Sequence, residues 1–223
     1  IVNHYKVSPH TIEIIYNGVN ISIFTPKNRT TYRDTVRATY GIAPDEVLLL
    51  FVGSGFKRKG LKYVIEALSL INKSQKTKLL VVGKGTIREH QRLARKNGVL
   101  DKLIFAGVCK HIQEIYAGGD IFVFPSEYDA FGTACLEAMA SGLPVIASKS
   151  SGVSEIIAQG QDGFVIHHPI DAREIAKYMN VLFIKEKREQ MGCAARQKAE
   201  MYSFEANTEK TLQVYRNVLH IHH

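Results

Sequence analysis

Short apolar runs alternate along the chain with longer segments in which apolar residues recur every three or four positions. The runs contain β-branched and aromatic residues and are too short for helices, so they predict strands buried on both faces of a sheet at 47–52, 78–82, 103–106, 121–124 and 163–166. The longer segments predict helices at 30–40, 61–71, 86–96, 111–117, 172–179, 186–199 and 205–218. This alternation predicts an α/β fold, a doubly wound parallel sheet of Rossmann-like type.

The stretch 119–157 organises the rest of the chain and reads strand, turn, helix, strand, helix. Pro125 ends its first strand, and Gly142 and Pro144 end the helix that opens at Thr133. The first N–H groups of that helix lack partners and carry partial positive charge, and Gly132 has no side chain to block an anion. The stretch therefore predicts an anion site.

Three turns follow strands of the predicted sheet: 54–60, the turn at Lys84, and 129–133. Ligands of such sheets bind beyond the carboxyl ends of the strands, so we expect these turns to meet at one edge. Lys57, Arg58 and Lys59 lie in the first turn. Cations and helix amides at one edge are typical of a diphosphate site.

Two acids bracket this site, Asp129 before the helix and Glu137 within it. Positions eight apart lie about 80° from one another around a helix axis, so separate contacts to one ligand are favoured over a paired dyad. The glycines at 53, 55 and 60 form neither G-x-G-x-x-G nor G-x-x-x-x-G-K-[ST], so dinucleotide and P-loop sites are not supported. No Asp-x-Asp pair occurs, which favours fixed Lys and Arg over a metal bridge to the diphosphate.

Composition limits the possible classes of protein but does not identify the reaction or the ligand. With 223 residues, 45% hydrophobic and 22% charged, the chain has material for one large domain or two small ones. No apolar run approaches the about 20 residues that span a bilayer, no signal peptide opens the chain, and the start at Ile1 suggests a fragment. Cys109, Cys135 and Cys193 show no C-x-x-C spacing, which favours buried thiols in a reducing cytosol.

The net charge of +8 permits a nucleic-acid or membrane partner. However, the Lys and Arg residues are spread along the chain, and no nucleic-acid-binding pattern is present. A small molecule that carries phosphate accounts for part of the excess, and we expect no nucleic-acid partner.

The segment PSEYDAFGTACLEAMASGLPVIASKSSGVSE resembles PSxxEGFGxxxLEAMAxGxPVIAs…GxxE, the signature of the family 4, or group 1, retaining glycosyltransferases of the GT-B class. The match departs at Asp129, where the family usually has glutamate, and at Ala130, where it has glycine. Residues 11–24 predict a short strand, an Asn-Gly turn and a coil that ends at Pro26. The segment at 17–26 resembles NGVDxxxFxP, which joins the two domains of these enzymes. The first turn resembles VGRLxxxKG, with Lys59 on the lysine and Ser54 in place of the arginine; this variant is closer to the lipopolysaccharide-core glucosyltransferase branch.

The resemblance implies the donor-binding, C-terminal domain of an enzyme that moves a sugar from a nucleoside-diphosphate sugar, most simply a UDP-sugar, to a glycan or lipid-linked acceptor. It implies Arg58, Lys59 and Asp129 as catalytic residues, Glu137 as the ligand of the ribose, and retention at the anomeric carbon. The remaining donor contacts fall on Gly53, Ser54, Lys84, Val108, Ala130, Phe131, Gly132 and Thr133. Neither a cofactor nor a metal is implied.

The same resemblance divides the chain into a crossover remnant at 1–27, the nucleotide-sugar-binding domain at 28–202, and a C-terminal helix and tail at 203–223. It implies an absent N-terminal acceptor domain, so we expect donor binding with little turnover. The intact enzyme is expected in the cytoplasm, with peripheral association at the inner face of the membrane.

Simpler interpretations remain open at this stage. Asp129 would need no ligand if it only forms the turn, and neither would Glu137 if it is a solvated residue of the helix. The basic turn could likewise be a solvated surface. A nucleotide-sugar epimerase and a non-catalytic nucleotide-binding domain are alternative functions. The terminal histidines, 220 and 222–223, are either native or a tag remnant, and we assign them no metal.

Overall fold

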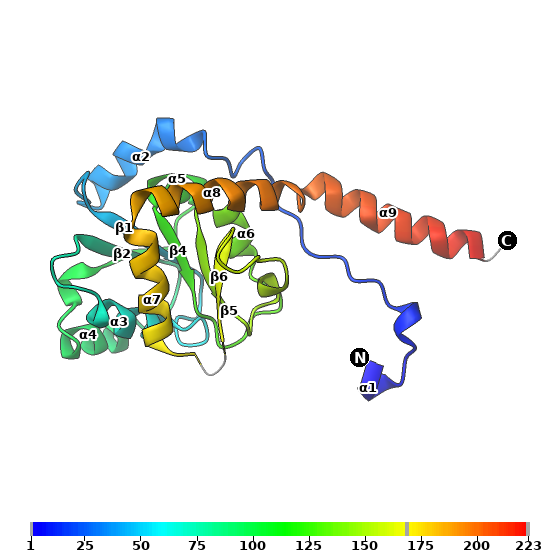
Figure 1. Cartoon of the computed structure of the whole chain (residues 1–223), viewed down its shortest axis with the longest axis horizontal. Helices are drawn as coiled ribbons and strands as arrows, with labels where there is room; N and C mark the ends of the chain where they lie inside the picture. The colour runs from blue at the N-terminus through cyan, green and yellow to red at the C-terminus, as the bar shows by residue number, and fades with distance from the viewer. Residues whose placement is uncertain (1, 168–169, 222–223) are drawn as a thin grey trace.

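A six-stranded parallel sheet forms the centre of the computed structural model, which describes residues 2–167 and 170–221 (Figure 1). The strand order is β3-β2-β1-β4-β5-β6. The strands are β1 (Val47–Val52), β2 (Thr77–Val82), β3 (Leu103–Gly107), β4 (Ile121–Phe124), β5 (Val145–Ser148) and β6 (Gly163–Ile166). All five neighbouring pairs are parallel. Because the chain winds outward from β1 to β3 and then returns to β4, the order reverses between β1 and β4, which is where α/β sheets of this kind bind ligands.

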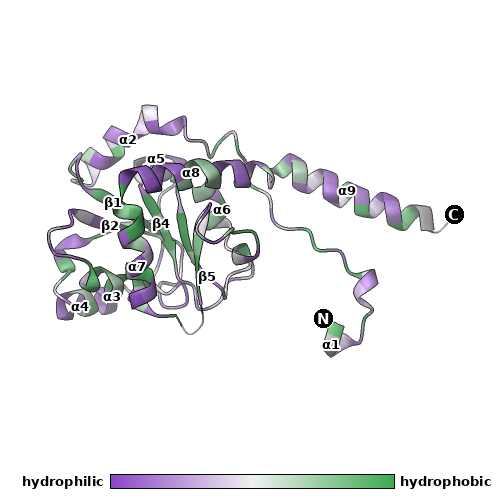
Figure 2. Ribbon diagram, viewed as in Figure 1, coloured by the Kyte–Doolittle hydropathy of each residue, from purple (hydrophilic) through white to green (hydrophobic). Residues whose placement is uncertain are grey.

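Side chains of each strand enter both faces of the sheet, which explains the continuous apolar runs. The strands β4 and β5 are coloured as hydrophobic in Figure 2. In β1, Leu48 and Leu50 belong to one core cluster, whereas Leu49 and Phe51 belong to the other. All four are fully buried. The core therefore consists of two layers separated by the sheet.

Helices cover both faces. One cluster includes residues of α2 (Asn28–Thr39), α5 (Ile112–Gly118) and α6 (Thr133–Ala140), and the other includes residues of α3 (Leu61–Leu70), α4 (Ile87–Lys96) and α7 (Ala172–Phe183). The helix α8 (Lys185–Glu200) contributes Ala195 to the first and Met191 to the second. This arrangement confirms the predicted doubly wound α/β fold.

Most predicted elements are present within two residues of their expected ends, but α7 ends four residues and α9 (Phe204–Ile221) three residues later than predicted, and three other details differ. The last part of 119–157 is a single 3-10 turn, η3 (Gly152–Glu155), rather than an α-helix. The predicted strand that opens at Thr11 is wrong: Pro9–Thr11 is the 3-10 turn η1, and the residues that follow are extended without a ladder. The 3-10 turn η2 (Leu100–Lys102) was not predicted.

The N-terminal strap, residues 12–27, contacts the C-terminal part of the chain around Tyr202 and Phe204. Val19 accepts a hydrogen bond from the Phe204 amide at 3.0 Å and donates one to the Tyr202 carbonyl at 2.9 Å. A Cβ on Gly18 would lie 2.9 Å from the Ser203 carbonyl oxygen, so glycine permits this close approach. Beyond the contact, α1 (Val2–Tyr5) and α9 (Phe204–Ile221) extend away from the sheet (Figure 1).

Two further expectations can be compared with the structure. Cys135 is buried and Cys109 is partly buried, but Cys193 is exposed, so the prediction of buried thiols fails there. Within 2–167 and 170–221, no helix has the length and apolar character needed to cross a bilayer. The histidines at 222–223 lie outside the described residues.

Candidate functional site

The turns after β1, β2 and β3 are joined through backbone hydrogen bonds at the carboxyl edge of the sheet. The Gly53 amide donates to the Val82 carbonyl at 2.9 Å, and the Gly55 amide donates to the Lys84 carbonyl at 2.7 Å. Gly83 has φ 129°, and a Cβ there would lie 2.2 Å from the Gly53 carbonyl oxygen. Only glycine fits such an approach. The expected meeting of the first two turns is thus confirmed.

The turn after β4 packs on the turn after β1. The Glu127 amide donates to the Arg58 carbonyl, and the Arg58 guanidinium donates to the Tyr128 carbonyl, both at 2.9 Å. A Cβ on Gly60, whose φ is 77°, would lie 1.9 Å from the Pro125 carbonyl oxygen. Since β1 and β4 are neighbours, these contacts fix the two turns at the place where the strand order reverses.

Lys59 and Asp129 form an ion pair between these turns. Their side chains are only 12% and 15% exposed. The Lys59 ammonium also lies over the Phe124 ring, 4.9 Å from its centroid, and the Asp129 carboxylate accepts from the Phe131 amide at 3.2 Å. The two residues that the sequence assigned to separate parts of a ligand are therefore partners in the ligand-free chain.

Two effects act on the Lys59 ammonium in opposite directions. Burial lowers the pKa of Lys59, and the neighbouring Arg58 charge lowers it further. The Asp129 carboxylate in contact with it favours the charged form of the ammonium. Lys59 is thus a cation that an incoming anion can recruit.

The N-terminus of α6 lies next to this pair. Gly132 precedes the helix with φ 92°, a left-handed conformation that favours glycine, and no side chain caps the helix. Its first turn contains no acid. The Ser151 hydroxyl donates to the Phe131 carbonyl at 2.9 Å and holds the turn against the loop after β5. The helix amides with the Lys59 cation make a site suited to an anion.

A cleft of about 450 Å³ opens in front of this turn. Its lining includes Asp129, all four residues of 130–133, and Glu155. The strap closes its other side through residues 14–17, where the Tyr16 hydroxyl donates to the Glu155 carboxylate at 2.7 Å. That hydrogen bond raises the pKa of Tyr16. No pattern in the sequence pointed to Tyr16, because a contact across 139 positions leaves no local signal.

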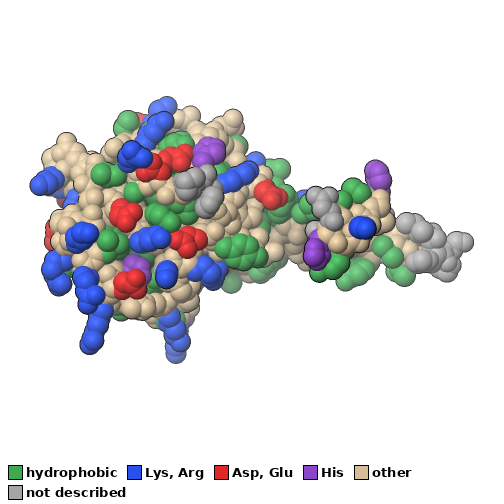
Figure 3. Space-filling model, turned by 90° about the horizontal axis from the view of Figure 1, so that it is seen from below, with side chains coloured by type: hydrophobic (Ala, Val, Ile, Leu, Met, Phe, Trp, Pro, Cys, Tyr) green, Lys and Arg blue, Asp and Glu red, His purple; other side chains and the backbone are tan. Residues whose placement is uncertain are grey.

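Arg58 faces a neighbouring cleft of about 390 Å³, lined also by Lys57, Gly85 and His90. Seen from below, Lys and Arg side chains are spread over this end of the molecule and interspersed with acids (Figure 3). Lys84 and Val108 are exposed near the same edge, after β2 and β3. The structure thus joins Lys59 to Asp129 but places Arg58 on the other side of the turn.

Glu137 is half-buried on α6, away from the lining of the 450 Å³ cleft. Burial raises the pKa of Glu137, and a hydrogen bond from the Tyr116 hydroxyl, at 2.9 Å, opposes the rise. Tyr116 is fully buried and also donates to the Ala134 carbonyl at 3.1 Å. The alternative of a fully solvated glutamate is therefore wrong. Tyr116 was missed because a tyrosine in a helix usually belongs to the core.

Residues 32–198 match the family described as "Glycosyl transferases group 1". The chain is 32% identical over 174 residues to the lipopolysaccharide glucosyltransferase WaaG of Escherichia coli strain K12, a match that covers 77% of this chain and 46% of that protein. The chain thus spans less than half the length of this curated relative.

Two solved structures have the same fold. The crystal structure of WaaG, a glycosyltransferase involved in lipopolysaccharide biosynthesis, is 29% identical with a TM-score of 0.84, and the match covers 96% of this chain and 58% of WaaG. The C-terminal domain of a glycosyl transferase group 1 family protein, LpcC of Francisella tularensis, is 25% identical with a TM-score of 0.73. That match covers 84% of this chain and 100% of the LpcC domain.

Proposed function

Because this chain belongs to the glycosyl transferases group 1 family, we propose that it is the donor-binding half of an enzyme that transfers a sugar from a nucleoside-diphosphate sugar. The acceptor is a glycan or a lipid-linked molecule, and a UDP-sugar is the donor. Transfer retains the anomeric configuration and uses no metal ion, as in family 4 of the GT-B class.

The observation that carries this proposal is the half-buried Lys59–Asp129 pair beside the uncapped N-terminus of α6. As the glycosidic bond breaks, negative charge grows on the leaving diphosphate. Lys59 and the amides of Gly132 and Thr133 stabilise that charge more strongly than the charge of the intact donor. Arg58 adds a second cation when the donor reaches across the turn into its cleft.

The other contacts follow from position. Asp129, released from Lys59, accepts hydrogen bonds from the sugar hydroxyls, together with the backbone of Ala130 and Phe131. Glu137 accepts hydrogen bonds from the ribose. The edge formed by Gly53, Ser54, Lys84 and Val108 holds the base and the diphosphate from the side of β1 to β3.

The coverage of relatives supports a second domain in the intact protein. The chain matches all of the LpcC C-terminal domain but 46% of WaaG. We therefore place the acceptor site on an N-terminal domain, with 1–27 as the crossover, 28–202 as the donor domain and 203–223 as the terminal helix and tail. This chain alone binds donor and turns over little, so acceptor-dependent transfer at an enzyme-like rate would contradict the proposal.

The similarity to WaaG supports a place in lipopolysaccharide-core synthesis or a related glycan pathway. Such an enzyme works in the cytoplasm and meets a lipid-linked acceptor at the inner face of the membrane.

Calorimetric titration of the chain with UDP, ADP, GDP and UDP-glucose tests the proposal, each with EDTA and again with Mg²⁺. We expect a preference for one nucleoside diphosphate, UDP, without metal. Affinity that is indifferent to an attached sugar would instead indicate a nucleotide-binding module. Hydrolysis of UDP-N-acetylglucosamine without an acceptor would indicate the epimerase class.

A further inference from the structure

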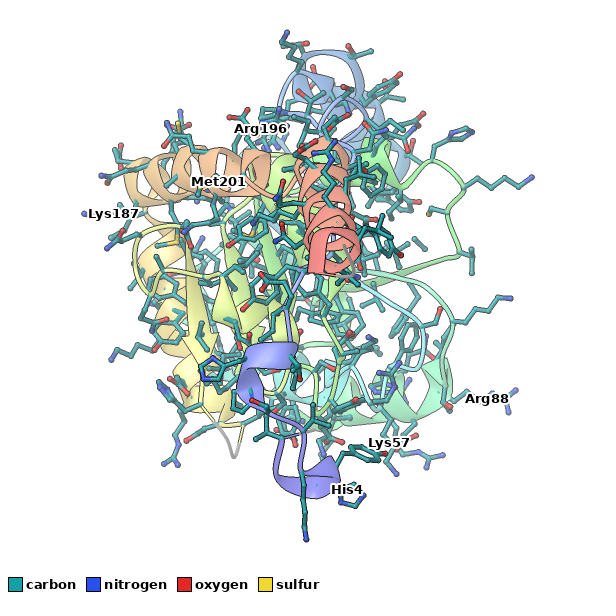
Figure 4. All side chains as sticks on the ribbon, turned by 90° about the vertical axis from the view of Figure 1, so that its right-hand side faces the viewer. His4, Lys57, Arg88, Lys187, Arg196 and Met201 are labelled. Atoms are coloured by element: carbon teal, nitrogen blue, oxygen red, sulfur yellow. The ribbon has the colours of Figure 1, made fainter. Side chains whose placement is uncertain are left out.

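A larger cavity, of about 730 Å³, lies at the opposite end of the sheet from the candidate site. It is lined by residues that begin or precede strands, Val47 of β1, Asp120 before β4 and Pro144 before β5. The helices α2 and α8 contribute Arg29 and Arg33, and Lys185, Arg188 and Arg196, to the lining. Figure 4 shows Arg196 of this lining at one end of the molecule and Lys57 at the other.

A buried carboxylate forms the floor of the cavity. Asp120 is 5% exposed, and its side chain accepts from the Leu48 amide at 2.8 Å and from Arg37 at 3.1 Å. Arg37 is 4% exposed and also donates to the carbonyls of Ala43 and Glu46, each at 2.6 Å. Burial alone would raise the pKa of Asp120, but the surrounding arginines and the Leu48 amide lower it. Arg37 thus suffices to neutralise this carboxylate.

Two further guanidinium groups lie on the same carboxylate. Arg33 donates to Asp120 Oδ1 at 2.8 Å, and Arg29 approaches the same oxygen at 3.4 Å. Their side chains are 25% and 31% exposed, so both line the cavity while remaining half-buried. Burial lowers the pKa of Arg29, and the charges of Arg33 and, more weakly, Arg188 lower it further. Arg188, on the first turn of α8, lines the same cavity and donates to the Leu182 carbonyl at 2.8 Å.

The remaining acids of the lining are engaged elsewhere. Asp45 pairs with Lys76 at 2.5 Å, and Glu189 lies 3.8 Å from Lys185 on an exposed face of α8. The Glu46 carboxylate accepts from a backbone amide of the loop before β1 at 2.8 Å. Five cations line the cavity, Arg29, Arg33, Lys185, Arg188 and Arg196, against four acids, Asp45, Glu46, Asp120 and Glu189, so the lining carries an excess of positive charge.

We propose that this arginine cavity binds a phosphate monoester dianion through Arg29, Arg33 and Arg188. Planar guanidinium groups match phosphate oxygens with paired N–H donors, and an anion would relieve the repulsion among the three cations. The first amides of α8 add partial positive charge at the same wall. The volume of about 730 Å³ leaves room for an organic group beside the phosphate. This proposal does not depend on the transferase function.

Titration of the chain with glycerol 3-phosphate tests this site. We expect binding that Arg188→Gln weakens by about ten-fold or more, the loss of one charge-assisted contact. Arg29→Gln should have a similar effect, and Arg188 provides the safer variant because it does not touch Asp120. Arg88→Gln, on the exposed face of α4, is the matched control that should leave the affinity unchanged.

Binding at the arginine cavity must be distinguished from binding at the donor site, because the donor site also attracts phosphate. Lys59→Met should retain glycerol 3-phosphate binding. Loss of all binding in Lys59→Met, unchanged affinity in the folded Arg188→Gln, or no binding by the unmodified chain would each overturn the proposal.

A phosphate monoester occurs both in free metabolites and in the headgroup of phosphatidic acid. Co-sedimentation with phosphatidic acid vesicles distinguishes these two sources. Binding of glycerol 3-phosphate without sedimentation assigns a soluble metabolite. Sedimentation that Arg188→Gln abolishes and Arg88→Gln does not assigns the headgroup.

Discussion

Exchange of partners by Lys59 is the step of the proposed function that can be measured most directly. In the ligand-free chain Lys59 is paired with Asp129. If a diphosphate takes the ammonium, part of its binding free energy is used to separate that pair. Asp129→Asn removes this cost, so it should raise the affinity for UDP.

The burial of the pair sets the size of the effect. Exposed pairs contribute about 0.2–1 kcal/mol, and breaking a fully buried pair costs about 3–5 kcal/mol. With 12% and 15% exposure, the Lys59–Asp129 pair lies between these limits, at about 1–2 kcal/mol. The affinity of Asp129→Asn for UDP should therefore rise by about 5- to 30-fold. UDP-glucose should gain less, because Asp129 no longer holds its sugar.

A double-mutant cycle on UDP affinity separates exchange from simple charge repulsion. Lys59→Met should weaken UDP binding by about 1.5–3 kcal/mol in the Asp129→Asn background, where Lys59 is free. In the native background the loss should be smaller by the energy of the pair. Calorimetry on the four proteins gives the coupling. Equal losses in both backgrounds would refute the exchange, whatever the effect of Asp129→Asn alone.

Two other predictions concern the framework of the site. Gly60→Ala should lower the free energy of unfolding in urea by about 3 kcal/mol or more, because its Cβ meets the Pro125 carbonyl; Gly41→Ala, with φ 63° and open space, should lose only about 1–2 kcal/mol. Similar losses would mean that the turn relaxes without cost. Burial raises the pKa of Glu137 above its ordinary value of 4.5, so protonation of Glu137 favours the folded state. The stability that this protonation contributes is present below pH 4.5 and is lost as the pH rises through the pKa of the folded state. In urea unfolding at a series of pH values, Glu137→Gln should flatten this part of the dependence of the free energy of unfolding on pH. Tyr116→Phe should extend the dependence to higher pH. If neither variant changes the profile, Glu137 is not its source.

The sheet could be predicted from the sequence because its strands are buried on both faces and are therefore apolar throughout. The strands at 47–52 and 121–124 have the predicted ends. The strap could not be predicted in the same way: the β-branched and aromatic residues at 12–16 suggest a strand, but no neighbouring strand pairs with them. Pattern in one segment does not reveal whether a partner exists.

The sequence predicted where the candidate site lies but not which of its side chains contact one another. Strand order places the turns of Lys59 and Asp129 together, and both residues were assigned from the position of their turns and from the resemblance to the family. Their mutual contact, and the hydroxyl of Tyr116 on Glu137, depend on side-chain directions that no local pattern encodes. Whether the assigned residues hold a donor stays a prediction.

The contact of Val19 with the residues before α9 has a mechanical consequence. Three hydrogen bonds join the strap to the start of α9: from the Val19 amide to Tyr202, from the Phe204 amide to Val19, and from the Asn207 side chain to the Tyr16 carbonyl. Tension applied between the strap and α9 would be borne first by these three bonds, before any hydrogen bond of the sheet. A pulling experiment should therefore show an early, low-force release of the strap, followed by a separate rupture of the sheet at higher force.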